Sequence, residues 1–109
     1  MKIKKKRTVA EATEFEKIKN DFFPRDEDLN ELIDFLALNP NAGDVYPEMK
    51  GLRKLRWPAK VKQVGKRGGY RVFFSYVSKT DTVWIHYIIA KYEQEDLPKK
   101  QLKQLRKKG

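Results

Sequence analysis

Apolar residues in the first third of the chain recur at helical intervals and form two stripes. The first stripe ends before Pro24, because the residue that precedes a proline is disfavoured in the helical conformation. The second stripe begins at Asp26 or Asp28 and stops at the turn-forming segment Asn39–Asp44. We therefore expect two consecutive helices. Their apolar positions are Phe15, Ile18 and Phe22 in the first, and Leu29, Leu32, Ile33, Leu36 and Ala37 in the second.

The residues before the first stripe predict a short strand and a helix start. Thr8–Ala12 has the composition of a short first strand. Thr13 is followed three positions later by Glu16, which is the spacing of a capping box. We therefore expect Thr13 to be the N-cap of the first helix.

After Gly51 the helical period is lost and an extended segment becomes the simplest interpretation. A strand over Leu52–Trp57 alternates its side chains between two faces. This alternation places Lys54 and Arg56 on one face, and Arg53, Leu55 and Trp57 on the other.

Two further strands and a last helix complete the predicted fold. Tyr70–Val77 is rich in β-branched and aromatic residues, Ser78–Asp81 is a hairpin turn, and Thr82–Ala90 returns as a nearly apolar interior strand. Lys99–Lys107 is a helix with Leu102 and Leu105 as its inward residues. The order β-α-α-β-β-β-α predicts an α+β fold with a mainly antiparallel sheet packed against helices. The 109 residues suit a single domain, 1–109, with residues 1–7 as a basic N-terminal extension.

Charge is distributed unevenly between these elements. Residues 8–48, which contain the two predicted helices, have a net charge of −8. Residues 49–79 have ten Lys and Arg residues and no Asp or Glu. Cations interleaved with strand-forming residues give a positive surface of fixed geometry, which attracts a polyanion and stabilises charge developing on a phosphate. Nucleic acid is therefore the first ligand class that we expect.

Composition excludes several kinds of chemistry. The chain has no cysteine, which excludes disulfides and thiolate catalysis and fits a reducing cytoplasm. It has one histidine, so a mechanism with a pair of histidines is impossible. No cluster of acidic residues accompanies the basic strands, and we expect no metal or other cofactor. Without a signal peptide or a membrane-spanning apolar run, we expect a cytoplasmic protein with no membrane partner.

Four segments together resemble the RelE/ParE toxin superfamily, and specifically its HigB-like branch. They are Asn39–Val45, Gly51–Arg56, Gly65–Val72 and Ala90–Leu97. The resemblance extends from Thr8 to Lys107, and its order and spacing are more specific than any one motif. Two features depart from the family pattern. The turn at residues 46–51 lacks the usual run of glycines, and Tyr92 stands where relatives commonly have asparagine.

This resemblance implies a function. It implies a RelE-like domain that acts as the toxin of a type II toxin–antitoxin system. Such a toxin is an mRNA interferase, an endoribonuclease that cleaves mRNA, usually on the ribosome, and thereby inhibits translation. The implied protein partner is a cognate helix-turn-helix antitoxin, through which operator DNA would be contacted only indirectly.

RNA cleavage of this kind needs few protein groups. The 2′-hydroxyl next to the scissile phosphate attacks the phosphorus once it has lost its proton. The protein must align that attack, offset charge on the phosphorane and protonate the leaving 5′-oxygen. Fixed cations meet the second need, and a Lys or Tyr with a shifted pKa, or a His, could supply proton transfer.

The candidate site residues follow from these two lines of argument. Arg71 lies at the beginning of a strand that directly follows a Gly-Gly pair, and it matches the superfamily's strand arginine that contacts the scissile phosphate. Lys54 and Arg56 share one strand face, and Lys91 and Tyr92 follow the last strand, where the resemblance implies the active face. The predicted catalytic residues are Arg71, Lys54, Arg56, Lys91 and Tyr92. The predicted RNA-binding residues are Arg53, Lys66, Arg67 and Tyr70.

Several alternatives stay open at this point. Tyr92 is as well explained by a structural role as by base stacking or proton transfer, and His86, on the same strand face as Trp84, Ile88 and Ala90, is better explained as an interior histidine. At the level of function, a related toxin that binds a protein target such as gyrase would need no cluster of cations at one phosphate. A non-catalytic module that binds RNA or the ribosome would leave its RNA uncut.

Overall fold

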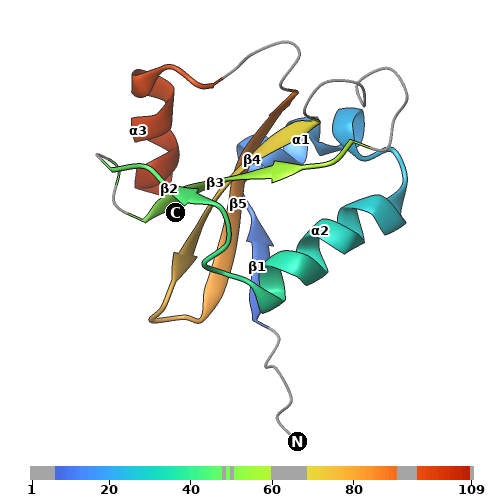
Figure 1. Cartoon of the computed structure of the whole chain (residues 1–109), viewed down its shortest axis with the longest axis horizontal. Coiled ribbons are helices and arrows are strands. Elements are labelled where there is room, and N and C mark those ends of the chain that lie inside the picture. Colours follow the sequence, from blue (N-terminus) through green and yellow to red (C-terminus); the bar gives the residue numbers. More distant parts are fainter. Residues whose placement is uncertain (1–6, 48, 50, 60–68, 91–95, 109) are drawn as a thin grey trace, which may run out of the picture.

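The computed structural model describes residues 7–47, 49, 51–59, 69–90 and 96–108. It contains three helices and five strands in these ranges, shown in Figure 1. In chain order they are β1 (Thr8–Glu11), α1 (Thr13–Phe22), α2 (Asp26–Leu38), β2 (Asp44–Val45), β3 (Leu52–Trp57), β4 (Tyr70–Val77), β5 (Thr82–Ala90) and α3 (Lys99–Lys108). The α+β class is confirmed, and the two-residue strand β2 is an addition to the predicted order. No helix in this part of the chain is long and apolar enough to cross a bilayer.

The five strands form one mixed sheet in the order β1-β5-β4-β3-β2. Neighbouring strands are antiparallel except β1, which runs parallel to β5. β5 pairs on both edges, as its apolar sequence predicted, and β4 occupies the middle of the sheet. The sheet separates α1 and α2 on one side from α3 on the other (Figure 1).

Each face of the sheet has its own apolar core. The larger core joins α1 and α2 to the inward residues of β4 and β5. The smaller core places α3 against the opposite face, where Leu102 and Leu105 are buried as predicted, together with Leu97. Because successive strand residues point to opposite faces, Val72 and Phe74 belong to the first core and Phe73 to the second.

The predicted capping box of α1 is wrong. Thr13 is the first residue of the helix, and Ala12 occupies the N-cap position without a side-chain hydrogen bond. The stabilisation of this helix start comes instead from Glu14 and Glu16 in the first turn, where negative charge complements the helix dipole. α2 likewise begins with three acidic residues after Arg25.

A bulge in β5 changes which residues share a face. Phe73 lies opposite Tyr87 and Phe74 lies opposite Ile85, so His86 is an additional residue with no partner in the register. The alternation of β5 therefore shifts at His86. The prediction that Trp84, His86, Ile88 and Ala90 share one face of β5 is wrong. Of these four residues, only Ile88 and Ala90 pack into the core beneath α1 and α2.

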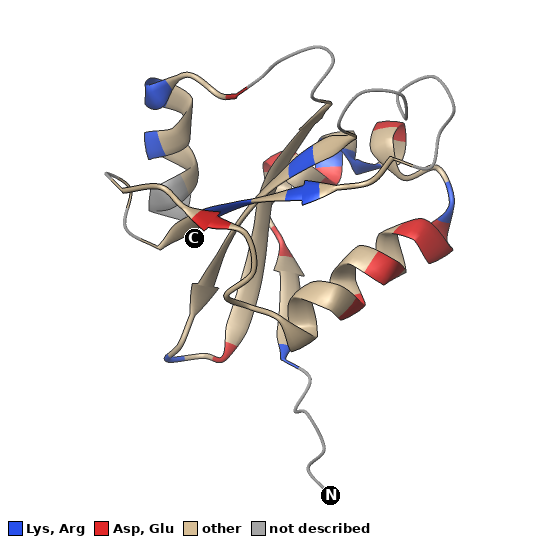
Figure 2. Ribbon diagram, in the orientation of Figure 1, with Lys and Arg blue, Asp and Glu red and all other residues tan. Residues whose placement is uncertain are grey.

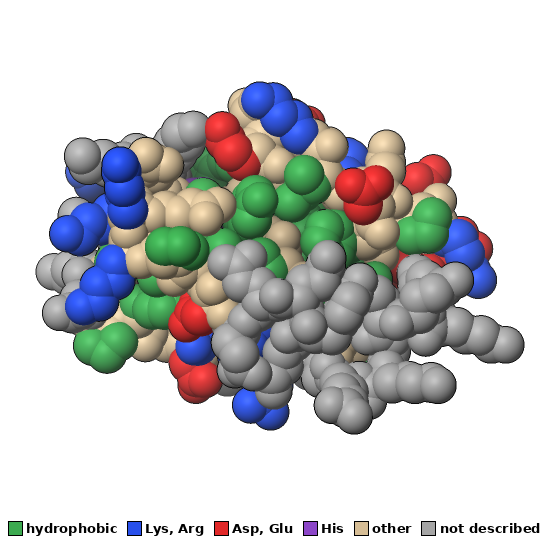
Figure 3. Space-filling view, turned by 90° about the horizontal axis from the view of Figure 1, so that it is seen from above, with side chains coloured by type: hydrophobic (Ala, Val, Ile, Leu, Met, Phe, Trp, Pro, Cys, Tyr) green, Lys and Arg blue, Asp and Glu red, His purple; other side chains and the backbone are tan. Residues whose placement is uncertain are grey.

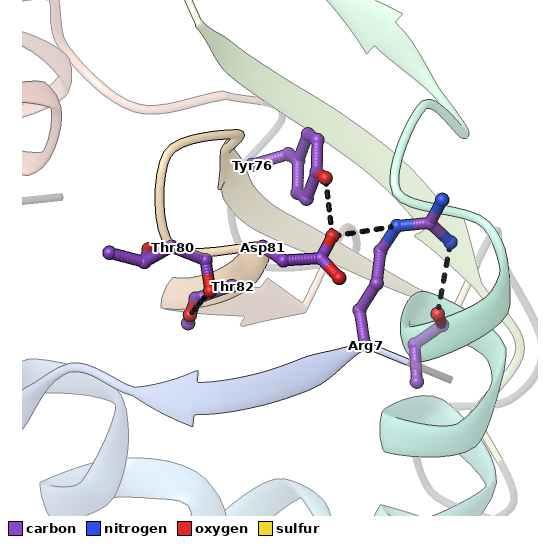
Figure 4. Close-up of polar contacts among 6 residues, drawn as sticks. Arg7, Tyr76, Thr80, Asp81 and Thr82 are labelled. Carbon is purple, nitrogen blue, oxygen red and sulfur yellow. Dashed lines mark hydrogen bonds and ion pairs between the residues drawn. The ribbon is translucent and has the colours of Figure 1, made fainter. Parts of the chain in front are cut away.

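The last residue of the basic extension, Arg7, is part of the fold. Its Nε lies 3.3 Å from an Asp81 carboxylate oxygen, which also accepts a hydrogen bond from Tyr76 (Figure 4). Its backbone N–H donates to the carbonyl of Ala37 at the end of α2. Arg7 thus links the start of β1, the end of α2 and the β4–β5 hairpin.

Candidate nucleic-acid interface

Three of the predicted catalytic cations lie together on the α3 side of the sheet. Arg56 of β3 is directly opposite Arg71 of β4 in the register, and residues in such a pair point to the same face. Lys54, two positions before Arg56, shares that face and lies opposite Phe73. Figure 2 shows basic residues along β3 and at the start of β4, and acidic residues along α2. The sheet therefore brings together Lys54, Arg56 and Arg71 as the alternation predicted.

Arg71 has an unusual environment for a cation. Only 9% of the residue is exposed, and its Nε is buried with no hydrogen-bond partner. Within the described ranges no carboxylate forms an ion pair with it. A buried charge without a partner is destabilising, and arginine cannot remove that cost by losing its proton. Such a guanidinium is suited to bind an anion that comes from outside the protein.

Lys54 has partners that the sequence analysis did not identify. Its Nζ lies 3.3 Å from Oδ2 of Asp96, which is three positions before the start of α3 at Lys99. The same ammonium lies 5.1 Å from the ring centroid of Tyr46, and the Tyr46 hydroxyl donates a 2.5 Å hydrogen bond to Oδ1 of Asp96. Tyr46 and Asp96 are 50 positions apart, so no local pattern could have joined them.

The environment of Tyr46 and Asp96 raises the pKa of the tyrosine and lowers the pKa of the aspartate. Desolvation raises the pKa of the Tyr46 phenol, and the hydrogen bond to Asp96 raises it further, while the nearby Arg71 guanidinium opposes this shift. Desolvation alone would raise the pKa of Asp96. Hydrogen bonds from Tyr46, the Leu97 amide and Lys54 outweigh it and lower that pKa. At neutral pH Asp96 is thus a carboxylate and Tyr46 a neutral phenol.

Two predicted RNA-binding residues lie elsewhere. Arg53 is on the face opposite Lys54, where its Nη1 donates to the backbone carbonyl of Asn41 at 2.8 Å. Tyr70 is only 2% exposed, and its hydroxyl donates to the carbonyl of Phe22. Its ring is buried in the first core and has no face available to a base, so the prediction that Tyr70 contacts RNA is corrected. We do not include Arg53 in the proposed interface, because its side chain lies on the opposite face of β3.

The other predicted site residues lie outside the described residues. These are Lys66 and Arg67 before β4, and Lys91 and Tyr92 after β5. Their assignment to the site stays a prediction.

His86 is an interior residue, as the sequence analysis favoured. It is fully buried, and its Nε2 lies 2.7 Å from the hydroxyl oxygen of Ser75. Burial lowers the pKa of His86 to about 4, so the ring is neutral at physiological pH. A side chain with no exposed surface cannot exchange protons directly with a substrate, so we do not include His86 in the site.

Two surface clefts offer less suitable places for a polyanion. One, of about 640 Å³, is lined by Glu11, Glu14 and Trp84 with Ala12 and Thr13. The other, of about 240 Å³, lies between α1 and the end of β5 and has Asp21 as its one charged side chain. Figure 3, viewed from above, shows apolar side chains grouped among charged ones on this end of the molecule. Negative charge in both clefts disfavours phosphate. In the described ranges, no three His, Asp or Glu side chains are grouped as metal ligands would be.

Comparison with known proteins identifies the fold. The sequence matches no known protein-family profile. The structure is similar to that of the toxin RelE of E. coli, solved in the free state as a mutant with two arginines replaced by alanine. The TM-score is 0.57 at 11% sequence identity, over 83% of this chain and 88% of that chain. At this identity the likeness concerns the fold, and the chain has the fold of the RelE toxin, as its sequence segments predicted.

Proposed function

We propose that this protein is the toxin of a type II toxin–antitoxin system and a metal-independent endoribonuclease that cleaves mRNA, with the ribosome presenting the substrate. The observation that carries the proposal is the buried guanidinium of Arg71. It lies opposite Arg56 on a RelE-like sheet and has no carboxylate partner among the described residues. A phosphate group is an anion that would satisfy it with charge-assisted hydrogen bonds.

In this proposal the cations act on the phosphate and leave the chemistry to the RNA. Arg71 and Arg56 contact the non-bridging oxygens, and Lys54 adds a third positive charge. These charges favour the phosphorane over the ground state, because negative charge on the phosphate increases as the 2′-oxygen attacks. Lys91 would complete the phosphate site, and Tyr92 would stack on a base or transfer a proton. Lys66 and Arg67 would contact neighbouring phosphates.

The partners follow from the same proposal. The toxin would act in the cytoplasm and would be held inactive by a cognate helix-turn-helix antitoxin. Operator DNA would be reached only through that antitoxin. The HigB-like branch stays the sequence-based expectation for the subtype.

The test is cleavage of a defined mRNA, free and bound to ribosomes, in the presence of EDTA. We expect the wild-type protein to cut the mRNA and Arg71→Ala to cut it at least about 100-fold more slowly, because removing one donor to a developing oxyanion costs about that factor. Arg71→Met, which fills most of the same volume, should be equally slow. A melting curve for each variant checks that the fold is intact.

Arg53→Ala is the matched control, since it removes the same charge from the opposite face of β3. Its cleavage rate should stay close to that of the wild type. Folded wild-type protein that binds RNA and cuts it in neither setting would contradict the proposal and favour a non-catalytic binding module. Full toxicity of Arg71→Ala in cells would instead favour a protein target.

A further inference from the structure

Asp96 is the one carboxylate among the described residues that pairs with a cation of the proposed phosphate site. It is partly exposed, with 39% of its side chain accessible, and Lys54 is 26% accessible. An ion pair this exposed contributes little to stability. A negative charge on this face also weakens the attraction of the sheet for RNA. Neither the stability that this ion pair contributes nor attraction for RNA therefore explains the contact between Asp96 and Lys54, and its geometry offers a better explanation.

The two oxygens of Asp96 have separate roles. Oδ1 accepts hydrogen bonds from the Tyr46 hydroxyl at 2.5 Å and from the Leu97 backbone N–H at 2.8 Å. Oδ2 faces the Nζ of Lys54 at 3.3 Å. The two donors on Oδ1 fix the rotation of the carboxylate, and this rotation aims Oδ2 at the lysine.

The supports of this carboxylate are themselves held by buried packing. Leu97, the residue after Asp96, is 6% exposed and belongs to the core beneath α3. The Tyr46 ring stacks on the fully buried Phe73 at a centroid distance of 6.2 Å. Lys54 is thus confined by a carboxylate anchored in the α3 core and by an aromatic ring anchored on β4.

We propose that Asp96 and Tyr46 are positioning residues that hold the Lys54 ammonium in its catalytic place. The inference rests on the proposed nuclease function and extends it. A lysine has a long, freely rotating side chain, and fixing it before the substrate arrives removes the cost of ordering it during the reaction. Asp96 does not contact the RNA in this proposal. It acts through Lys54, at the expense of some attraction for the substrate.

The proposal predicts opposite effects of Asp96→Asn on binding and on cleavage. The asparagine carbonyl oxygen can still accept from Tyr46 and Leu97, whereas its NH₂ group replaces Oδ2 and can no longer hold an ammonium. We expect the single-turnover cleavage rate of ribosome-bound mRNA at saturating protein to fall by about 10- to 100-fold. The Kd for an uncleavable 2′-O-methyl RNA should be unchanged or tighter, because a negative charge has been removed from the face.

Tyr46→Phe is the matched second variant. It keeps the ring over Phe73 and beside Lys54 and removes only the hydroxyl that orients Asp96. We expect a smaller decrease in the cleavage rate, again without weaker RNA binding. If Asp96→Asn cleaves as fast as the wild type or faster, the positioning role is overturned. Parallel losses of cleavage, binding and thermal stability would also overturn it, because they indicate a structural role.

A measurement without activity separates this inference from the proposed function. In ¹⁵N NMR of the lysine ammonium groups, Lys54 of the wild type should move more slowly than exposed lysines, and Asp96→Asn should release it. Equal mobility in the two proteins would overturn the inference even if the wild type cleaves RNA. A wild type that cuts nothing, with Lys54 held by Asp96, would overturn the proposed function and leave the positioning contact established.

Discussion

Two buried polar side chains, Arg71 and His86, differ in their charge in the folded protein. His86 is fully buried, and burial lowers its pKa to about 4, so the neutral ring needs no counter-charge. Arg71 cannot respond in this way because a guanidinium keeps its proton. One nitrogen of each, Nδ1 of His86 and Nε of Arg71, is buried without a hydrogen-bond partner. Arg71 has in addition a fixed positive charge and, among the described residues, no carboxylate partner of the kind that Asp81 provides for Arg7, and this is why it marks the proposed site.

The histidine predicts how stability depends on pH. In the unfolded chain His86 titrates near its ordinary pKa of 6.5, whereas in the folded protein it titrates near 4. Between these values the unfolded state binds a proton that the folded state does not bind. The free energy of unfolding should therefore decrease as pH falls below 6.5, by about 2 kcal/mol between pH 7.5 and pH 5. Urea unfolding at these two pH values measures the change.

His86→Gln supplies the reference for that measurement. Glutamine does not titrate and can keep a hydrogen bond to the Ser75 hydroxyl. Acidic residues contribute equally to both proteins, so the difference between the two pH dependences reports His86 alone. If wild type and His86→Gln lose the same stability between pH 7.5 and pH 5, the lowered pKa is refuted.

At the scale of elements, every helix and strand that the structure describes was predicted from the sequence except β2. Both acidic helices and the strands Tyr70–Val77 and Thr82–Ala90 have their predicted bounds or lie within a residue of them. β2 was missed because two residues, Asp44 and Val45, have no period to detect. The bulge at His86 was missed because nearly every residue of this strand is apolar, so the sequence shows no change of alternation at that position. Only the pairing with β4 shows that one residue is additional.

The connection between α2 and β3 contains a matched pair of glycines that tests its geometry. Gly43 and Gly51 both have positive φ, at 73° and 90°. A Cβ on Gly43 would meet the backbone oxygen of Lys54 at 2.2 Å, whereas a Cβ on Gly51 would meet nothing within 4 Å. Gly51→Ala should therefore cost about 1 kcal/mol of backbone strain. Gly43→Ala should cost about 1–3 kcal/mol more, because β2 must move away from β3.

Thermal and urea unfolding of the two alanine variants give this comparison directly. Because Gly43 contacts the backbone of Lys54, Gly43→Ala should also slow RNA cleavage, and Gly51→Ala should leave it nearly unchanged. Equal destabilisation by the two substitutions would show that β2 does not approach β3 as closely as described.

At the scale of the whole molecule, the site was predictable where it depends on one strand and hidden where it depends on several segments. Alternation along β3 correctly separated Lys54 and Arg56 from Arg53. The partners of Lys54 could not be predicted, because Tyr46 and Asp96 come together only when α3 packs onto the sheet. Tyr70 was misassigned because its place next to a loop suggested exposure, whereas its side chain points into the α1 and α2 core.

Acidic residues on one side of the sheet and cations on the other predict where RNA binds. α2 begins with three acidic residues, and Lys54, Arg56 and Arg71 lie on the opposite side of the sheet. If RNA binds the cationic face, an arginine there should contribute to affinity and its salt dependence, and one on the helix side should not. Arg56, which is exposed on the cationic face, and Arg53, which is bonded to the Asn41 carbonyl, are the matched pair.

Both Arg56→Ala and Arg53→Ala remove one positive charge from β3, so net charge alone predicts equal effects. A contact between Arg56 and a phosphate predicts that Arg56→Ala lowers the slope of log Kd against log salt by about 0.7, the value for one ion released from single-stranded nucleic acid. Arg53→Ala should leave that slope unchanged. Fluorescence anisotropy with 2′-O-methyl RNA over a KCl series measures both. Equal changes of this slope for the two variants would mean that RNA responds to the net charge of the whole molecule. They would contradict the assignment of the cationic sheet face as the interface.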